Sequence, residues 1–258
     1  MVDFGSGQGP SVSATTGIAS AISRVAEKRE RSLGPKDAVY GWTLVKANLT
    51  AIDCDSMGQD LWLFEKKSID NGFSRIAGID EAGRGPLAGP VVSAAVILPN
   101  YLHIPGISDS KKLTPKKRAY LYDKIYDRAI SIGIGIVDPP EIDRINILQA
   151  ALLSMAMASE NLAPQPDCLL IDGIFKISST LPQEPIPKGD ARSISIAAAS
   201  IIAKVTRDRL MERYHQDYPQ FGFSKHKGYP TKAHKAAIRE FGSCPIHRQS
   251  FKGVKEYL

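Results

Sequence analysis

Apolar residues recur along the chain with two different periods, and together they predict alternating strands and helices. From residue 130 to residue 136 every second position is isoleucine. This is the period of a strand, so one strand is predicted over residues 130–137. Continuous apolar runs are typical of strands buried on both faces. They predict three more strands, over residues 76–80, 91–98 and 168–171.

Helices are predicted in the longer apolar and charged segments between these strands. They cover residues 60–70, 115–128, 141–161, 195–217 and 231–242. Thr114 followed by Pro115 is a typical helix start, and Thr231 caps the last helix in the same way. Residues 174–187 hold too many prolines and glycines for a helix and predict an irregular or hairpin-like connection. Residues 221–230 predict a basic loop. Strands that alternate with helices indicate an α/β layered fold.

Composition describes an ordinary globular protein with an uneven charge. Of the 258 residues, 43% are hydrophobic and 23% are charged, which is typical of one large domain, alone or with an appendage. The formal net charge is +6, yet residues 188–258 alone carry 14 Lys or Arg against 6 Asp or Glu. This basic C-terminal part favours a polyanion such as nucleic acid as the partner, and a solvated basic surface is the alternative.

Several classes of protein are disfavoured by the remaining composition. Cys54, Cys168 and Cys244 are odd in number and form no CxxC pair, so neither a disulfide framework nor a zinc site is indicated. No run approaches the roughly 18 apolar residues that span a membrane. The N-terminus lacks the pattern of a secretory signal. We therefore expect a cytoplasmic protein with no membrane partner.

The first 56 residues differ in character from the rest of the chain. Residues 1–35 are rich in Gly, Ser, Thr and Ala, a composition typical of disorder, and the apolar residues of 36–56 show no clear period. We expect residues 1–56 to form a disordered N-terminal extension and residues 57–258 to form the folded domain. A small folded N-terminal module is the alternative.

Acidic residues follow two of the predicted strands. Asp80 and Glu81 end the first strand, Asp172 ends the strand over 168–171, and Asp190 precedes the long helix. Carboxylates that converge at strand ends repel one another, and a hard divalent cation such as Mg²⁺ or Mn²⁺ relieves that repulsion. Adjacent strand residues point to opposite faces, so a backbone turn after Asp80 is needed to aim Glu81 inward. For Asp190, a turn or helix-capping role is the alternative.

Five motifs resemble those of the ribonuclease HII family. They are IAGIDEAGRGPLAGPVVSAAVIL from residue 76, SDSKKL, LLIDG, KGD followed by AAASIIAKVTRDRLM, and HKGYPTKAH. The resemblance runs in order from about Asp60 to the C-terminus. It implies a ribonuclease-H-like fold, an α/β fold with a mixed five-stranded sheet flanked by helices and a helical C-terminal part. Residues 1–56 match nothing in that family's pattern.

The family's four catalytic acids fall on Asp80, Glu81, Asp172 and Asp190. The resemblance implies that these carboxylates bind Mn²⁺ or Mg²⁺ and support two-metal hydrolysis. Cleavage is expected on the 5′ side of a ribonucleotide, in RNA/DNA hybrids and at single ribonucleotides embedded in duplex DNA. The products are a 3′-hydroxyl and a 5′-phosphate. Such a nuclease removes ribonucleotides from DNA and takes part in RNA primer removal.

Substrate recognition is implied for two further segments. The loop Gly83, Arg84 and Gly85 is similar to the family loop that contacts the ribonucleotide 2′-hydroxyl and the junction phosphates, and glycines let main-chain groups approach that hydroxyl. Tyr229 matches the tyrosine that stacks on the following sugar, and a loop anchor is its alternative role. Lys111 and Lys112 match a segment that approaches the phosphate backbone, with surface solvation as the alternative.

Basic residues near the C-terminus are expected to contact the duplex without reading its sequence. They are Lys204, Arg207, Lys225, Lys227 and Lys232. His226 and His234 are expected to contact phosphates or to hydrogen-bond within their loop. We expect a monomer. A ribonuclease HIII-type enzyme is one alternative, disfavoured by Arg84 and by the unstructured character of residues 1–56. A non-catalytic duplex-binding protein is the other.

Overall fold

The computed structural model describes residues 60–107, 110 and 113–258, which form one mixed five-stranded sheet with helices on both faces. The strands are β1 (Ile76–Ala82), β2 (Val91–Ile97), β3 (Ser131–Val137), β4 (Cys168–Asp172) and β5 (Gln183–Ile186). Their order across the sheet is β3-β2-β1-β4-β5. The pairs β1–β2 and β2–β3 are antiparallel, whereas β1–β4 and β4–β5 are parallel. The expected ribonuclease-H-like sheet is therefore confirmed.

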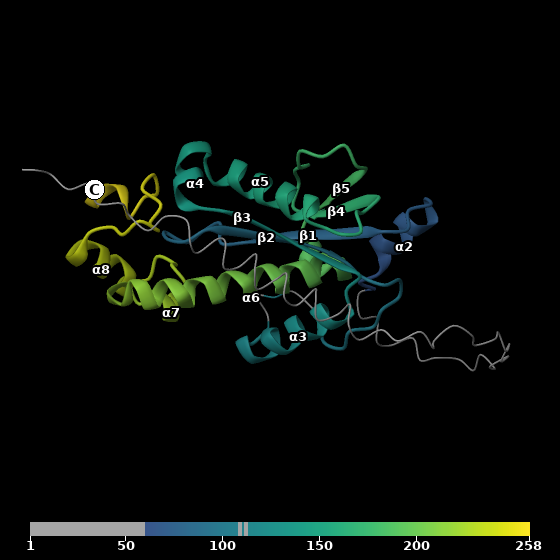
Figure 1. Cartoon of the computed structure of the whole chain (residues 1–258), viewed down its shortest axis with the longest axis horizontal. Coiled ribbons are helices and arrows are strands. Elements are labelled where there is room, and N and C mark those ends of the chain that lie inside the picture. The colour runs from purple at the N-terminus through teal and green to yellow at the C-terminus, as the bar shows by residue number, and fades with distance from the viewer. Residues whose placement is uncertain (1–59, 108–109, 111–112) are drawn as a thin grey trace, which may run out of the picture. The chain divides into compact units, whose positions relative to one another are not determined.

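Helices cover the two faces of this sheet unequally. They are α2 (Leu63–Asp70), α3 (Pro115–Arg128), α4 (Pro139–Ile145), α5 (Ile147–Glu160), α6 (Ile194–Asp217), α7 (Phe223–His226) and α8 (Lys232–Phe241). In Figure 1, α4 and α5 lie on one face, α6 lies on the other face, and α3 lies beyond α6. Short 3₁₀ turns occupy Gly189–Ala191, Pro219–Phe221 and Lys255–Tyr257. No helix within the described residues is long and apolar enough to cross a membrane.

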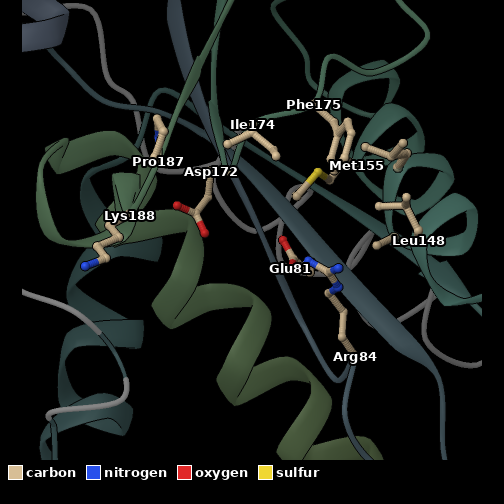
Figure 2. A pocket seen from close by; sticks show the side chains of 12 residues that line it. Glu81, Arg84, Leu148, Met155, Asp172, Ile174, Phe175, Pro187 and Lys188 are labelled. Atoms are coloured by element: carbon tan, nitrogen blue, oxygen red, sulfur yellow. Dashed lines mark hydrogen bonds and ion pairs between the residues drawn. The ribbon is translucent and has the colours of Figure 1, made fainter.

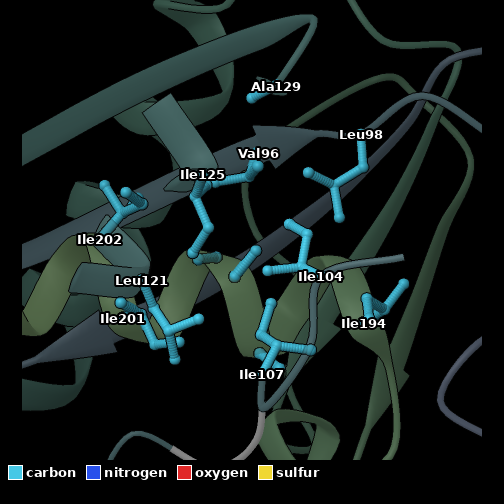
Figure 3. Packing of buried hydrophobic residues seen from close by; sticks show 14 of the residues in the cluster. Val96, Leu98, Ile104, Ile107, Leu121, Ile125, Ala129, Ile194, Ile201 and Ile202 are labelled. Carbon is cyan, nitrogen blue, oxygen red and sulfur yellow. The ribbon is translucent and has the colours of Figure 1, made fainter. Parts of the chain in front are cut away.

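The long helix α6 packs very closely on β1. A Cβ atom at Gly78 would lie 2.2 Å from the main-chain carbon of Ser195, and three consecutive alanines of α6, at 197–199, are fully buried. The outer side of α6 meets α3 through an apolar cluster that includes Leu121, Ile125 and Ile201 (Figure 3). The start of α6 therefore lies over Gly78, and the helix runs along β1 so that Ser200 reaches Asp80 and Arg207 reaches Gly83.

On the other face, α5 packs on the glycines of β3. Cβ atoms at Gly133 and Gly135 would lie 2.0 Å and 1.9 Å from helix carbonyl oxygens. The isoleucines that alternate with these glycines face the opposite layer, and Ile132 and Ile134 pack there against the α3 and α6 cluster. The strand predicted from their spacing is confirmed, and its small residues explain how α5 approaches so closely.

Three local predictions are wrong. The single helix expected over 141–161 is two helices, because Asn146 takes φ +68° and its side chain accepts hydrogen bonds from the first amides of α5. The connection 174–187 contains the strand β5, whose four residues are too few to show a period. The basic loop 221–230 contains the one-turn helix α7. The prediction for residues 1–56 lies outside the described residues.

Candidate active site

Three carboxylates meet at the carboxyl ends of two parallel strands. The register of β1 and β4 pairs Ile79 with Ile171, so Asp80 and Asp172 follow at the same level. The Asp172 carboxylate accepts a hydrogen bond of 2.7 Å from the Gly189 amide, which ties the 3₁₀ turn carrying Asp190 to the same point. Oxygen atoms of Asp80, Asp172 and Asp190 lie within 4.8 Å of one another.

Burial and mutual repulsion make this group electrostatically costly. Asp80 is 2% exposed and Asp190 is 6% exposed. Burial raises the pKa of Asp80 well above its ordinary value, and the charges of Glu81 and Asp172 raise it further. Hydrogen bonds from Ser200 and the Glu81 amide oppose that rise. A set of closely spaced carboxylate oxygens fits a hard divalent cation, which would lower the repulsion that raises this pKa.

Glu81 occupies the opposite face of β1. Ala77 and Ile79 pack towards α5, and the period of two places Glu81 on that face while Asp80 faces α6. The backbone turn expected directly after Asp80 is absent, because β1 continues to Ala82. Glu81 is therefore outside the three-carboxylate group. Its carboxylate instead pairs with the Arg84 guanidinium at 3.2 Å.

The Glu81 carboxyl nevertheless shares a cavity with one member of this group, Asp172. Burial raises the pKa of Glu81, Arg84 lowers it, and the charge of Asp172 raises it again. In Figure 2, Glu81 and Asp172 both point into the pocket, with Arg84 beside Glu81. The cavity has a volume of about 330 Å³. Residues of α5, of the ends of β1 and β4 and of the segment before Asp190 line it.

The rest of this cavity was not predicted from the sequence. Lys188, which precedes the Asp190 turn, adds a cation to its lining. Ile174 and Phe175 follow Asp172 and form an apolar wall with Met155 of α5 (Figure 2). Ile174 is 68% exposed and Phe175 is 47% exposed, which is unusual for side chains of this size. Their position directly after the LLIDG motif is the sequence signal that could have indicated them.

The glycine loop leaves β1 at Gly83, one residue after Ala82 ends the strand. Gly83 takes φ +100°, and a Cβ there would lie 2.1 Å from the Nε atom of Arg207, so only glycine fits. A Cβ at Gly85 would lie 3.7 Å from the Tyr229 ring. The Leu87 amide donates to the Gly228 carbonyl at 2.8 Å. These contacts bring Tyr229, which is 43% exposed, beside the Gly83–Gly85 segment.

The prediction that Arg207 contacts the duplex is wrong. Its side chain is 1% exposed, because residue 207 lies on the inward side of α6. Lys204 and Lys227 form ion pairs with Asp208 and Glu212, at 2.7 Å and 3.0 Å. Lys225 and Lys232 are exposed. Lys111 and Lys112 lie outside the described residues.

The two histidines hydrogen-bond within their loop, which is the second of the two roles considered. His226 contacts the Phe221 carbonyl oxygen at 2.8 Å. His234 contacts the Tyr229 carbonyl oxygen at 2.9 Å through Nδ1, and its Nε2 lies 3.0 Å from Nε2 of His247. The other nitrogen of His247 accepts from the Cys244 amide at 2.9 Å. The buried His234 and His247 rings are thus linked to each other, and His234 holds the main chain of Tyr229 at its carbonyl oxygen.

Acidic residues at the ends of adjacent central strands of a mixed five-stranded sheet define the ribonuclease-H-like class of metal-dependent nucleases. Comparison with known proteins narrows that class. The profile of the family "Ribonuclease HII" matches residues 77–254. The chain therefore belongs to the ribonuclease HII family of endoribonucleases, which confirms the resemblance and decides against the ribonuclease HIII alternative.

Individual relatives agree with the family match. The ribonuclease HII of Geobacter metallireducens is 57% identical over 205 residues, which cover 79% of this chain and 96% of the relative. That of Geobacter sulfurreducens is 57% identical over 198 residues, covering 77% and 91%. Among solved structures, the ribonuclease H2 of Pyrococcus horikoshii OT3 is 29% identical with a TM-score of 0.60, and the match covers 71% of this chain and 97% of that one.

Proposed function

We propose that the chain hydrolyses the phosphodiester on the 5′ side of a ribonucleotide in duplex with DNA. The substrates would be RNA/DNA hybrids and duplex DNA with single embedded ribonucleotides, and the products a 3′-hydroxyl and a 5′-phosphate. The observation that carries the proposal is the convergence of Asp80, Asp172 and Asp190 within 4.8 Å. Such a nuclease would serve ribonucleotide removal from DNA and RNA primer removal.

The donor set indicates the cofactor. Asp80, Asp172 and Asp190, together with Glu81 from across the cavity, would hold Mg²⁺ or Mn²⁺. When bound, paired divalent cations supply an activated water and stabilise the leaving oxygen of an in-line displacement. The chain's own part is to keep these carboxylates close, and the packing of α6 on β1 supports that role.

The loop side of the site would select the substrate. Arg84 lies beside Glu81 at the mouth of the cavity and offers a cation to a phosphate. Gly83 and Gly85 carry no side chain, so main-chain groups can reach a 2′-hydroxyl. The exposed Tyr229 ring beside Gly85 offers a flat surface to the next sugar. Phosphate contacts from Lys111 and Lys112, and a monomeric state, stay predictions.

The decisive test is cleavage of a labelled DNA duplex that contains one ribonucleotide, with Mg²⁺ or Mn²⁺ and with the cut position mapped. We expect a single cut on the 5′ side of the ribonucleotide and none in an all-DNA duplex of the same sequence. Binding without cleavage would support the non-catalytic alternative. Cleavage confined to runs of ribonucleotides would contradict the proposed action on single ones.

A further inference from the structure

Two buried arginines hold the glycine loop from beneath. Arg248 is fully buried and Arg207 is 1% exposed, and each donates its hydrogen bonds to main-chain carbonyls. Arg248 donates to the carbonyls of Gly83 at 2.5 Å, Arg84 at 2.9 Å, Pro86 at 2.9 Å and Gly89 at 2.9 and 3.0 Å. Arg207 donates to those of Pro90 at 2.9 Å, Ala88 at 3.0 Å and Lys227 at 3.0 Å. Most carbonyls of residues 83–90 therefore face a guanidinium.

Neither arginine forms an ion pair with a carboxylate among the described residues. Burial lowers the pKa of Arg207 to about 10 and that of Arg248 to about 9. Both groups are thus still charged at neutral pH. The two guanidinium groups give the loop of residues 83–90 a positive electrostatic potential. This potential favours an anionic ligand on the side of the loop that faces away from the arginines.

Peptide geometry fixes what the loop presents on that outer side. In a planar trans peptide the carbonyl of one residue and the N–H of the next point in opposite directions. The carbonyls of Gly83 and Arg84 point at Arg248, so the N–H groups of Arg84 and Gly85 point away from it. No described residue accepts a hydrogen bond from these two N–H groups. They lie on the same short segment that Tyr229 flanks.

The neighbouring amides follow the same rule but have protein partners. The Pro86 carbonyl points at Arg248, and the Leu87 amide beyond it donates to the Gly228 carbonyl at 2.8 Å. The Ala88 carbonyl points at Arg207, and the next amide donates to Ile246 at 2.8 Å. The Arg84 and Gly85 amides, on the exposed part of the loop, have no such partner among the described residues and are available to a ligand.

We propose that Arg248, assisted by Arg207, is a positioning residue that sets the preference for a ribonucleotide. It would do so by turning the Arg84 and Gly85 N–H groups towards the 2′-hydroxyl and its adjoining phosphate. This inference rests on the proposed function. Lysine keeps the charge, but all three of its N–H donors sit on one nitrogen atom. It therefore cannot reproduce the planar guanidinium fork that reaches four carbonyls. Arg248→Lys therefore separates orientation from charge.

The experiment measures duplex binding by fluorescence anisotropy with Mg²⁺ in an Asp80→Asn background, so that the substrate stays intact. The full chain is compared with Arg248→Lys, Arg207→Lys and the control Arg239→Lys, which changes an exposed arginine of α8. We expect Arg248→Lys to reduce the preference for a one-ribonucleotide duplex over all-DNA by about tenfold, and Arg239→Lys to leave it unchanged. An unchanged preference in a folded Arg248→Lys, verified by circular dichroism, would overturn the inference.

A second measurement needs no change to either arginine. In ¹⁵N–¹H spectra of the Asp80→Asn chain, adding the one-ribonucleotide duplex should shift the Arg84 and Gly85 amides far more than the Leu87 and Gly89 amides. Equal or absent shifts at Arg84 and Gly85 would contradict the inference even if the lysine variants fail to fold. If the unmodified chain neither cuts nor prefers that duplex, the proposed function itself fails.

Discussion

The two sides of the site are built in opposite ways. On the acid side, side chains at the ends of β1 and β4 and in the turn before α6 bring negative charge together. On the loop side, main-chain groups of residues 83–90 are directed by cationic side chains that come from 117 to 165 positions later in the chain. Each acid stands at the end of the strand, or in the turn, that places it, whereas the loop is directed by arginines that belong to other parts of the fold.

This difference predicts different costs for substitution. The acid side carries its own repulsion, because the pKa of Asp80 is raised by burial and then by its acidic neighbours. Neutralising one carboxylate should therefore remove part of this repulsion and leave the folded state as stable or more stable, while it also removes a ligand of the cation. On the loop side the cations satisfy carbonyls that would otherwise be buried without partners, so their removal costs stability as well. A substitution on the acid side should therefore lower activity without lowering stability, whereas loss of a cation on the loop side should lower both.

The largest expected effect is that of Asp80→Asn on the acid side. We expect kcat to fall by roughly 10³-fold or more, at least as much as the loss of one strong electrostatic contact in an active site. The midpoint of thermal unfolding should stay the same or rise, because one of the repelling charges is gone. Single-turnover cleavage and calorimetry on the same sample check both. Near-full turnover in this variant would contradict the assignment of Asp80.

The next largest effect is expected from substituting Glu65, whose carboxylate holds the start of α6, the helix that follows Asp190. Glu65 of α2 is buried, and one of its oxygens accepts from the Ser193 hydroxyl at 2.5 Å and from the Ser195 amide and hydroxyl at 3.0 and 2.6 Å. Glu65→Ala should lower the free energy of unfolding by about 3 kcal/mol, because these donors lose their acceptor. Glu65→Gln keeps an acceptor and should cost less. Equal losses in denaturant titration would refute this role.

On the loop side, the buried histidines behind Tyr229 should make stability depend on pH. Burial lowers the pKa of His234 and of His247 to about 4, from an ordinary value of 6.5. The unfolded chain therefore binds protons first, and stability is lost as the pH falls from about 6.5 towards 4. The loss at pH 5 is on the order of 2 kcal/mol for each ring that titrates independently. Denaturation at pH 7 and pH 5 measures it, and His234→Asn should reduce the difference.

These two sides also differ in how far the sequence predicts them. The sequence predicts the two strands as apolar runs that end in acid, at Asp80 and Asp172. Because parallel strands place such ends side by side, it also predicts that these two carboxylates meet. Glu81 keeps strict strand alternation, so its place on the α5 face was available from the period alone. Arg248 was not predicted, since nothing in its neighbourhood indicates that its guanidinium reaches a loop 165 residues away. Such a pairing appears only with the fold.

A smaller effect is expected for Arg84→Ala, at the border between the two sides. We expect kcat/KM on the one-ribonucleotide duplex to fall about tenfold, the size of one hydrogen bond to a charged group. The free energy of unfolding should fall by only about 1 kcal/mol, because the Arg84 side chain is 51% exposed although that of its partner Glu81 is 11% exposed. Arg144→Ala is a matched control, since it removes an exposed pair with Glu141 at the same three-residue spacing. An equal loss of activity in both variants would contradict a substrate contact by Arg84.

The smallest effect is expected from deleting residues 1–56, which lie outside the described residues. The family profile begins at residue 77, and 205 residues of this chain already cover 96% of the Geobacter metallireducens relative. Cleavage should therefore stay within about twofold, a barrier change of about 0.4 kcal/mol. Deleting residues 1–72 is the matched control, because it also removes Glu65 and should destabilise the start of α6. A large loss already on deleting residues 1–56 would show that this segment serves the reaction, whereas a loss only on the longer deletion would assign the dependence to α2.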